Sequence, residues 1–388
     1  MRKWFAAYLR KWKDPGIRKP DPILSVAWVL AIGSAFAIPP DALYLGYIDW
    51  RSLGILWSLM VVIQGLKENA VFEKVGTAVT GRVSNIRGLT AAMVFLCFFG
   101  SMFVTNDVAL LTFVPLSIML FHGCGKDELV SWLVILQTIA ANLGSMLTPI
   151  GNPQNLYLFG LTKTPIGTFL LWMLPYTLLT AVVLSAVIVF FPSGKEKAVL
   201  GGRSATVRHF GSPLQIGVYL LLFLLAMLTV LRVIPWWITA LCTLIIVFAM
   251  DYKILKRADY TLLFTFIGFF VFTGNMARIP AVRDVLQDAI RRREFPVAIL
   301  TSQVISNVPA ALLLSDFAGD LKELLLGVNV GGLGTMIASM ASLISYKFYS
   351  NSYPDQKGLY FLRFTLLNLV MLALLILLHL FLSPQPTR

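Results

Sequence analysis

Apolar residues recur along the chain in long segments separated by short polar or basic stretches. A spanning helix needs about 20 predominantly apolar residues, and several of the segments reach that length. The pattern therefore predicts an all-α polytopic membrane protein. The segments cover residues 22–39, 50–66, 88–121, 129–162, 165–192, 213–232, 235–250, 260–277, 295–318, 322–350 and 358–382.

Two of the segments are interrupted near their middle, by "TND" at 105–107 and by "SNVP" at 306–309. An unpaired backbone N–H or C=O in hydrocarbon costs several kcal/mol, so non-helical backbone persists there only where protein covers it or where it lines a wet cavity. We interpret both segments as re-entrant hairpins, at 88–122 and 295–318, with their polar tips near the bilayer midplane.

Each hairpin is followed by an apolar segment with a glycine-rich break, "LTPIGNPQNLYLF" at 147–159 and "NVGGLGTMIAS" at 329–339. Unwound carbonyls can hold a cation, and the N-termini of half-helices favour an anion. Four breaks at one depth predict one substrate and ion site. Its candidate residues are Thr105, Asn106, Asp107, Thr148, Pro149, Gly151, Asn152, Pro153, Asn155, Ser306, Asn307, Val308, Pro309, Gly331, Gly332, Gly334 and Thr335.

The two halves of the chain share the same order of parts. An aromatic-rich span beginning at Asp49 matches one beginning at Asp259, and an amphipathic stretch, a hairpin and a broken segment follow each span. An odd number of spans separates the copies, which predicts inverted repeats and, with them, a secondary transporter. The predicted parts are a basic interfacial segment at 1–21, the repeats at 22–192 and 213–383, and a linker at 193–212.

Composition and charge narrow the function. Hydrophobic residues make up 57% of the chain and charged residues 13%, unlike a soluble domain. The net charge of +13 comes from Lys and Arg in loops and at segment ends. It therefore indicates a cytoplasmic N-terminus rather than a nucleic-acid partner. The stretch 280–294 contradicts this rule, because the predicted crossings place it outside. The three cysteines and three histidines have no metal-ligand spacing, so neither a disulfide framework nor a cofactor is expected.

The paired tips, each followed by "GNPQN" or "GGLGT", resemble the ion transporter superfamily, which includes divalent anion:sodium symporters, arsenite permeases and some sodium/proton antiporters. The resemblance implies a homodimer in a prokaryotic inner membrane, with a scaffold and an elevator-like transport domain. Surface helices at 70–86 and 280–294 would join the two. A coupling Na⁺ would lie among Thr105, Asn106, Gly151, Ser306, Asn307 and Gly332.

The symporters' Ser-Asn-Thr motif falls on 105–107 and 306–308. Both copies keep the Asn and a preceding hydroxyl, and both lose the final Thr. Val308 cannot donate a hydrogen bond, and an ionised Asp107 would repel a carboxylate. The Asn-Asp pair is more similar to the arsenite permease branch, which implies a neutral or weakly charged substrate or exchange against protons.

The resulting prediction is a carrier of a small anion, oxyanion or carboxylate, coupled to Na⁺ or H⁺. Alternatives remain open: an ion channel, a sodium/proton antiporter, or an intramembrane hydrolase using Asp316 and Asp320. The sequence contains no HExxH or G-x-S-x-G motif for the hydrolase, so we expect no enzyme. Structural roles are also open, with Asp107 as a helix N-cap and "GNPQN" as an ordinary turn.

Overall fold

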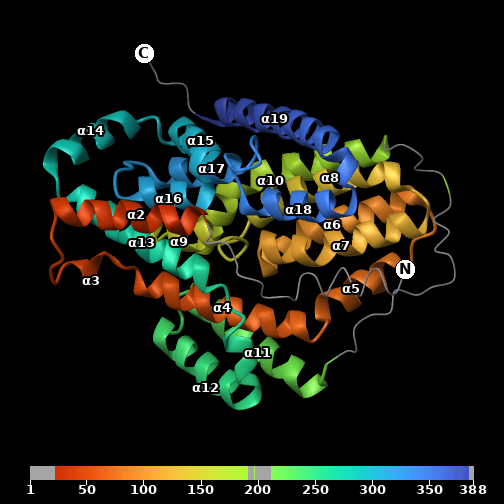
Figure 1. Cartoon of the computed structure of the whole chain (residues 1–388), viewed down its shortest axis with the longest axis horizontal. Helices are drawn as coiled ribbons and strands as arrows, with labels where there is room; N and C mark the ends of the chain where they lie inside the picture. Colours follow the sequence, from red (N-terminus) through yellow and green to blue (C-terminus); the bar gives the residue numbers. More distant parts are fainter. Residues whose placement is uncertain (1–21, 191–195, 197–210, 384–388) are drawn as a thin grey trace.

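The computed structural model describes residues 22–190, 196 and 211–383, and every regular element within them is helical (Figure 1). Eight of these helices are long and apolar enough to cross a bilayer, which confirms the prediction of an all-α polytopic protein. The predicted segment 1–21 and nearly all of the linker 193–212 lie outside the described residues. The eight are α6 (Ile86–Val104), α7 (Asn106–Gly123), α8 (Asp127–Ser145), α10 (Ile166–Val189), α11 (Pro213–Val230), α12 (Trp236–Leu255), α13 (Tyr260–Ala277) and α19 (Lys357–Leu382), the last extended by the short η1 (Pro354–Gln356).

The predicted amphipathic stretches form two further helices. α5 (Val71–Thr80) follows α4 (Trp50–Glu68) after a bend of 57°. In the second half, α14 (Pro280–Ile290) follows α13. Both are shorter than the stretches 70–86 and 280–294 from which they were predicted.

The two polar tips are one-residue breaks between helices. Thr105 separates α6 from α7, and Ser306 separates α15 (Glu294–Ile305) from α16 (Asn307–Ser315). Both break residues have positive φ, 73° and 76°, with ψ at 149° and 156°. Only glycine adopts this conformation readily, so each tip stores backbone strain.

The hairpins differ in length. α6 and α7 contain 19 and 18 residues, so each arm by itself could cross a bilayer. α15 and α16 contain 12 and 9 residues and are too short to cross. Helix length therefore agrees with re-entry for the second hairpin and does not decide it for the first.

The two broken segments are α8 with α9 (Pro153–Thr162), and α17 (Leu321–Val330) with α18 (Met340–Ser352). The first break begins after Ser145, where α8 ends, one residue before the predicted stretch 147–159. Pro153 does not unwind a helix, because it is the first residue of α9, where its missing N–H costs nothing. In the second break only Gly334 takes a left-handed conformation, with φ at 101°.

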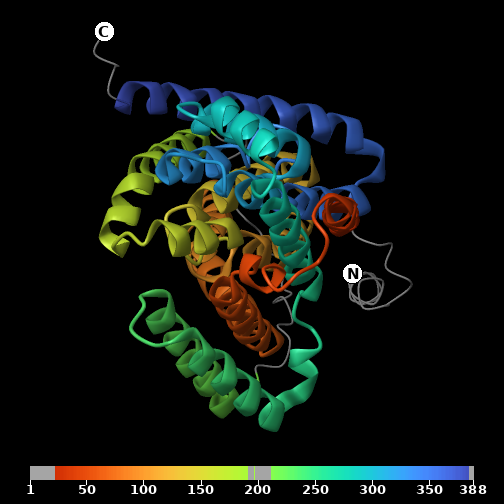
Figure 2. The same ribbon diagram turned by 90° about the vertical axis from the view of Figure 1, so that its left-hand side faces the viewer.

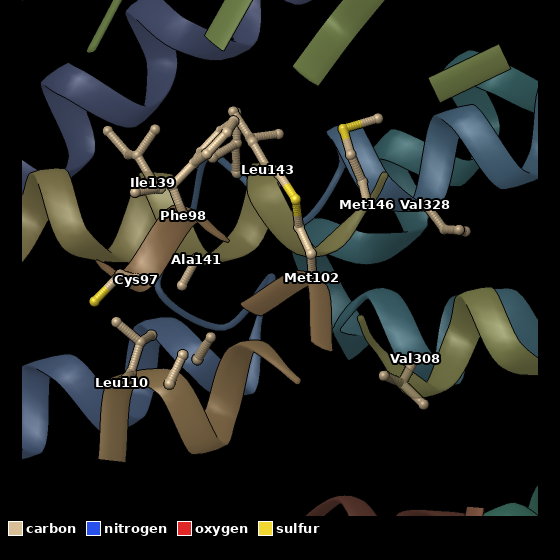
Figure 3. Packing of buried hydrophobic residues seen from close by; sticks show 14 of the residues in the cluster. Cys97, Phe98, Met102, Leu110, Ile139, Ala141, Leu143, Met146, Val308 and Val328 are labelled. Carbon is tan, nitrogen blue, oxygen red and sulfur yellow. The ribbon is translucent and has the colours of Figure 1, made fainter. Parts of the chain in front are cut away.

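The helices form two apolar cores. α6–α9 and α15–α18 build the interior of the larger one, and α2 (Pro22–Ala37) packs along α13 beside the short α3 (Tyr44–Tyr47) (Figure 1). α11 and α12 lie apart and pack on α4 around a smaller core, whereas α19 lies on the opposite side (Figure 2). Around the first hairpin the larger core contains Cys97, Phe98 and Met102 from α6, Leu110 from α7, and Ile139, Ala141 and Leu143 from α8 (Figure 3).

Candidate functional site

Each hairpin tip is hydrogen-bonded to the break of the broken segment that follows it. The backbone N–H of Asn106 donates to the carbonyl of Gly151 at 3.1 Å. The backbone N–H of Asn307 donates to the carbonyl of Ala338 at 2.9 Å. Both asparagine side chains are buried, so the tips are fixed inside the protein rather than exposed at a surface.

The two broken segments also bond to each other. Asn142, near the end of α8, accepts at its Oδ1 from Ser339 Oγ at 3.0 Å and from Asn106 Nδ2 at 3.1 Å. Asn329, near the end of α17, accepts at its Oδ1 from Asn152 Nδ2 at 3.0 Å. The predicted tips and breaks from both halves therefore join one buried polar network.

These contacts reveal a register between the two broken segments. Read forward from Asn142 and from Asn329, the segments match position for position without a gap, and equivalent residues make equivalent bonds. Thr148 Oγ1, for example, donates to the carbonyl three residues before the first tip, and Thr335 Oγ1 does the same in the second half. The equivalent pairs are Asn142 and Asn329, Gly144 and Gly331, Thr148 and Thr335, Gly151 and Ala338, Asn152 and Ser339, and Asn155 and Ser342.

Asn155 holds the first break in shape. Its Nδ2 donates to the carbonyls of Met146 at 3.0 Å and Thr148 at 3.1 Å, and its Oδ1 accepts from Asn329 Nδ2 at 2.6 Å. Its backbone N–H donates to Asn152 Oδ1 at 2.9 Å, which caps α9. "GNPQN" is therefore a helix start as well as a turn, held by side-chain bonds to backbone carbonyls of the break.

At the second break, the side chain of Gln303 bonds to the backbone as Asn155 does at the first. Its Nε2 donates to the carbonyls of Gly331 and Leu333, both at 2.9 Å, and its Oε1 accepts from the backbone N–H of Thr335 at 2.8 Å. A Cβ on Gly334 would lie 2.4 Å from Gln303 Oε1, so the bare glycine backbone is required here.

Asp107 places a carboxyl group beside the first tip. Its backbone N–H donates to Asn106 Oδ1 at 2.9 Å, whereas its own Oδ1 is buried without a hydrogen-bond partner. The N-cap of α7 is Thr105, so Asp107 lies in the first turn and does not cap the helix. A carboxylate in that turn is favoured by the partial positive charge of the helix N-terminus. The structural alternative for this residue, a capping role, is thus wrong.

The other predicted residues divide into groups. Val308 and Pro309 are buried in the first turn of α16 and offer no side-chain hydrogen bond. A Cβ on Gly332 would lie 2.8 Å from Asn307 Nδ2, so this glycine lets the second tip approach the break. Pro149 lies in the break with no side-chain hydrogen bond to give. Within residues 22–190, 196 and 211–383, no group of three or more His, Cys, Asp or Glu could hold a metal ion.

The carboxylates considered for a hydrolase have structural positions. Asp320 caps α17, since its Oδ1 accepts from the backbone N–H groups of Lys322 at 2.9 Å and Glu323 at 3.2 Å. Asp316 is the C-cap residue of α16.

Sequence reasoning missed several members of the network: Asn142, Gln303, Asn329, Ser339 and Ser342. A signal for two of them was present, because Asn-x-Gly recurs as "NLG" and "NVG" at matched positions of the two broken segments.

Comparison with known proteins places the chain among membrane transporters. Residues 16–323 match the family model described as CitMHS, citrate transporter. The inner membrane protein YbiR of Escherichia coli is 31% identical over 339 residues, which cover 84% of this chain and 87% of that protein. The uncharacterized transporter MJ0456 of Methanocaldococcus jannaschii is 31% identical, covering 77% and 81%. The silicon efflux transporter LSI3 of rice is 34% identical over 130 residues, 33% of this chain and 26% of that protein. The predicted resemblance to the ion transporter superfamily is thereby confirmed.

Proposed function

The chain belongs to the citrate transporter family CitMHS, and on that basis we propose that it is a secondary transporter for a small oxyanion or weakly charged oxyacid. Transport proceeds by alternating access and is coupled to Na⁺ or H⁺. The observation that carries this proposal is the buried polar network, in which two strained tips meet two broken helices within an apolar helical bundle. Non-helical backbone at such depth is typical of transporter binding sites.

The composition of the network favours a neutral or weakly charged oxyacid over a polycarboxylate such as citrate. Its members are amides, hydroxyls and backbone groups, and Asp107 adds a carboxyl group beside the first tip. Citrate would need cationic partners to compensate its charge. The rice relative, whose name describes silicon efflux, is consistent with this class of substrate.

Asp107 is the group that couples transport to an ion in this proposal. Carboxylates within membrane-spanning helices are rare and usually functional, and a buried Oδ1 without a hydrogen-bond partner can accept a proton or a cation. A Na⁺ ion would use the hydroxyl, amide and carbonyl oxygens of both tips and breaks, as the resemblance implies.

The arrangement of the helices supports a division into two bodies. α4, α11 and α12 surround the smaller core, whereas both hairpins and both broken segments surround the larger one. We assign the former, with α2 and α13, to a dimerising scaffold and the latter, with α10 and α19, to an elevator-like transport domain. α5 and α14 connect the two. The N-terminus is cytoplasmic in this assignment, and the two halves are inverted repeats in a prokaryotic inner membrane.

Transport by purified protein in liposomes tests the proposal. We expect saturable uptake of orthosilicic acid or arsenite driven by an imposed pH or Na⁺ gradient, and little uptake of citrate. Asp107→Asn should abolish the dependence on the coupling gradient. Asp284→Asn, on the exposed face of α14, is the matched control and should transport like the wild type. A gradient dependence that persists in Asp107→Asn would exclude this residue as the ion carrier.

An ion channel or a sodium/proton antiporter is the alternative, because the paired tips could also line an ion path. Counterflow distinguishes the carrier from the channel: unlabelled substrate inside the liposome should accelerate entry of labelled substrate from outside. Non-saturating flux without counterflow would support the channel. Exchange of Na⁺ against H⁺ without any oxyacid would support the antiporter.

A further inference from the structure

The matched register of the two broken segments exposes one bond that is made in only one of them. Asn329 Nδ2 donates to Asn155 Oδ1 at 2.6 Å. The equivalent atoms on the other side are Asn142 Nδ2 and Ser342 Oγ, and neither has a hydrogen-bond partner. Asn142 is 4% exposed and Ser342 is fully buried. Buried donors are nearly always paired in folded proteins, so two orphans at one place require an explanation.

Neither orphan is satisfied by a local bond in this structure. The orientation of the Asn142 amide is fixed, since its Oδ1 accepts from two donors, Asn106 Nδ2 and Ser339 Oγ. A serine within a helix commonly donates to the carbonyl four residues earlier. For Ser342 that carbonyl belongs to Ala338, which already accepts from the backbone N–H of Asn307 at 2.9 Å and from Ser306 Oγ at 3.4 Å.

The N-terminus of α18, next in sequence to Ser339, also lacks a side-chain cap. Asn152 caps α9 through its Oδ1, but the equivalent N-cap residue of α18, Ser339, makes no side-chain cap bond, and its hydroxyl donates to Asn142 Oδ1 instead. The first backbone N–H groups of α18 therefore lack a side-chain acceptor, and Ser342 lies in that same first turn. Helix N-termini of this kind bind electron-rich oxygen atoms.

We propose that Asn142 and Ser342, together with the first turn of α18, bind an oxygen atom of the transported oxyacid. This inference rests on the proposed function and adds the residues that recognise the substrate. Asn142 Nδ2 and Ser342 Oγ donate to the oxygen, and the helix N-terminus stabilises the partial negative charge on that oxygen. Because Asn142 also accepts from Asn106, the bound oxygen lies one amide away from the tip that carries Asp107. The equivalent place on the α9 side is filled by Asn155, so the two-part network provides one oxygen site rather than two.

Binding and transport by the full-length protein test the site. Orthosilicic acid, arsenite and citrate serve as probes, and each is measured by its effect on the melting temperature in detergent and by its KM in liposomes. Ser342→Ala removes an oxygen that makes no bond in the ligand-free protein, so the ligand-free melting temperature should not fall. The ligand-induced shift should shrink, and KM should rise about tenfold. Asn142→Asp keeps both accepted bonds but replaces the donor by an acceptor, and should weaken binding further.

Thr265→Ala is the matched control, because it also deletes a buried hydroxyl, on α13, which donates to the carbonyl of Thr261 and not to a member of the network. It should leave KM and the ligand-induced shift unchanged.

The outcomes separate this site from the proposed function. Wild-type KM in both Ser342→Ala and Asn142→Asp would overturn the site and leave the transporter proposal intact. A lower ligand-free melting temperature in Ser342→Ala with an unchanged KM would mean that the site holds a structural water, which also overturns it. Oxyacid binding that is lost in the variants, without any transport by the wild type, would retain the site and overturn the function. Absence of binding of all three probes to the wild type would overturn both.

Discussion

The backbone groups of the two helix breaks are hydrogen-bonded by different side chains. The α8–α9 break is closed by its own amides, with Asn155 bonded to Met146, Thr148 and Asn329. The α17–α18 break is held by Gln303 on the hairpin arm, and Ser342 Oγ has no hydrogen-bond partner. The first break is therefore built for rigidity, and the second keeps donors free.

This difference shows how one site can arise from two similar halves. Equivalent tip bonds place both asparagines at the breaks, so the framework is shared. In the proposed oxygen site, the difference between Asn155 and Ser342 is what leaves donors free on one side. A buried donor left unpaired costs free energy until a ligand satisfies it, so the open side is the one expected to respond to substrate.

We expect the largest effect from a substitution at Gly151, whose equivalent in the second broken segment is Ala338. A Cβ at Gly151 would lie 2.0 Å from the carbonyl oxygen of Ser145, a backbone atom that cannot move aside. Gly151→Ala should therefore destabilise the protein by about 3 kcal/mol or more, measured as loss of melting temperature and of monodisperse protein in detergent. Ala338→Gly is the control and should cost at most about 1 kcal/mol. Equal tolerance of both substitutions would show that the breaks are not shaped as described.

Asn155→Ala should be the next most severe change. It removes one of the two acceptors of Asn329 Nδ2, which keeps the carbonyl of Leu325, and the donor to the carbonyls of Met146 and Thr148, at a cost of about 2–3 kcal/mol. Thermal unfolding in detergent measures the loss. The substitution at the equivalent position, Ser342→Ala, should leave the melting temperature unchanged. A fall of the same size in both variants would contradict the difference between a closed and an open break.

Ser342→Asn gives the second broken segment the same residue that the first one has at the equivalent position, Asn155. The new amide oxygen could accept from Asn142 Nδ2, as Asn155 accepts from Asn329, and should add about 1 kcal/mol to the free energy of unfolding. The same bond would occupy the proposed oxygen site and reduce uptake at least tenfold. Unfolding and transport measured on one preparation should therefore change in opposite directions. Full activity in a stabilised variant would show that this place does not receive substrate.

We expect the smallest effect from glycine substitutions at the strained tips, Thr105 and Ser306, which both halves share. Glycine adopts their backbone conformation without strain, although it also gives the unfolded chain more freedom. Each substitution to glycine should therefore raise stability by about 1 kcal/mol, measured by thermal unfolding. Ala91→Gly within α6 is the control and should lower stability by about 1 kcal/mol. Destabilisation at both tips would mean that their hydroxyls contribute more than the strain costs.

The sequence predicted the parts that depend on strong local signals. Polar residues inside apolar segments located both breaks within the predicted stretches 105–107 and 306–309, because polar groups are costly in hydrocarbon. The ends of most helices followed from the extent of the apolar segments. The first break was predicted at 147–159 and covers 146–152, because the sequence did not show that Pro153 begins a helix. The sequence alone does not distinguish a proline that starts a helix from one that ends it.

The partners across the network could not be predicted in the same way. Gln303 and Asn142 lie inside regular helices, and their bonds join residues 28 or more positions apart, so no local pattern reports them. The role of Ser342 depends on what its neighbours already bind, a property of the folded network alone. The repeated Asn-x-Gly was the one accessible signal, and it becomes meaningful once the breaks are matched.

The unequal arms of the hairpins have an electrical consequence. α15 extends about 18 Å and α6 about 28 Å, against a hydrocarbon thickness of about 30 Å. A charge that reaches the tips beside the short arms crosses a smaller share of the transmembrane voltage than one that arrives beside the long arms. Since a full crossing of 100 mV is worth about 2.3 kcal/mol per elementary charge, loading from the two compartments should differ in its dependence on membrane potential. Current recordings at varied holding potential would then report on hairpin geometry without any labelled substrate.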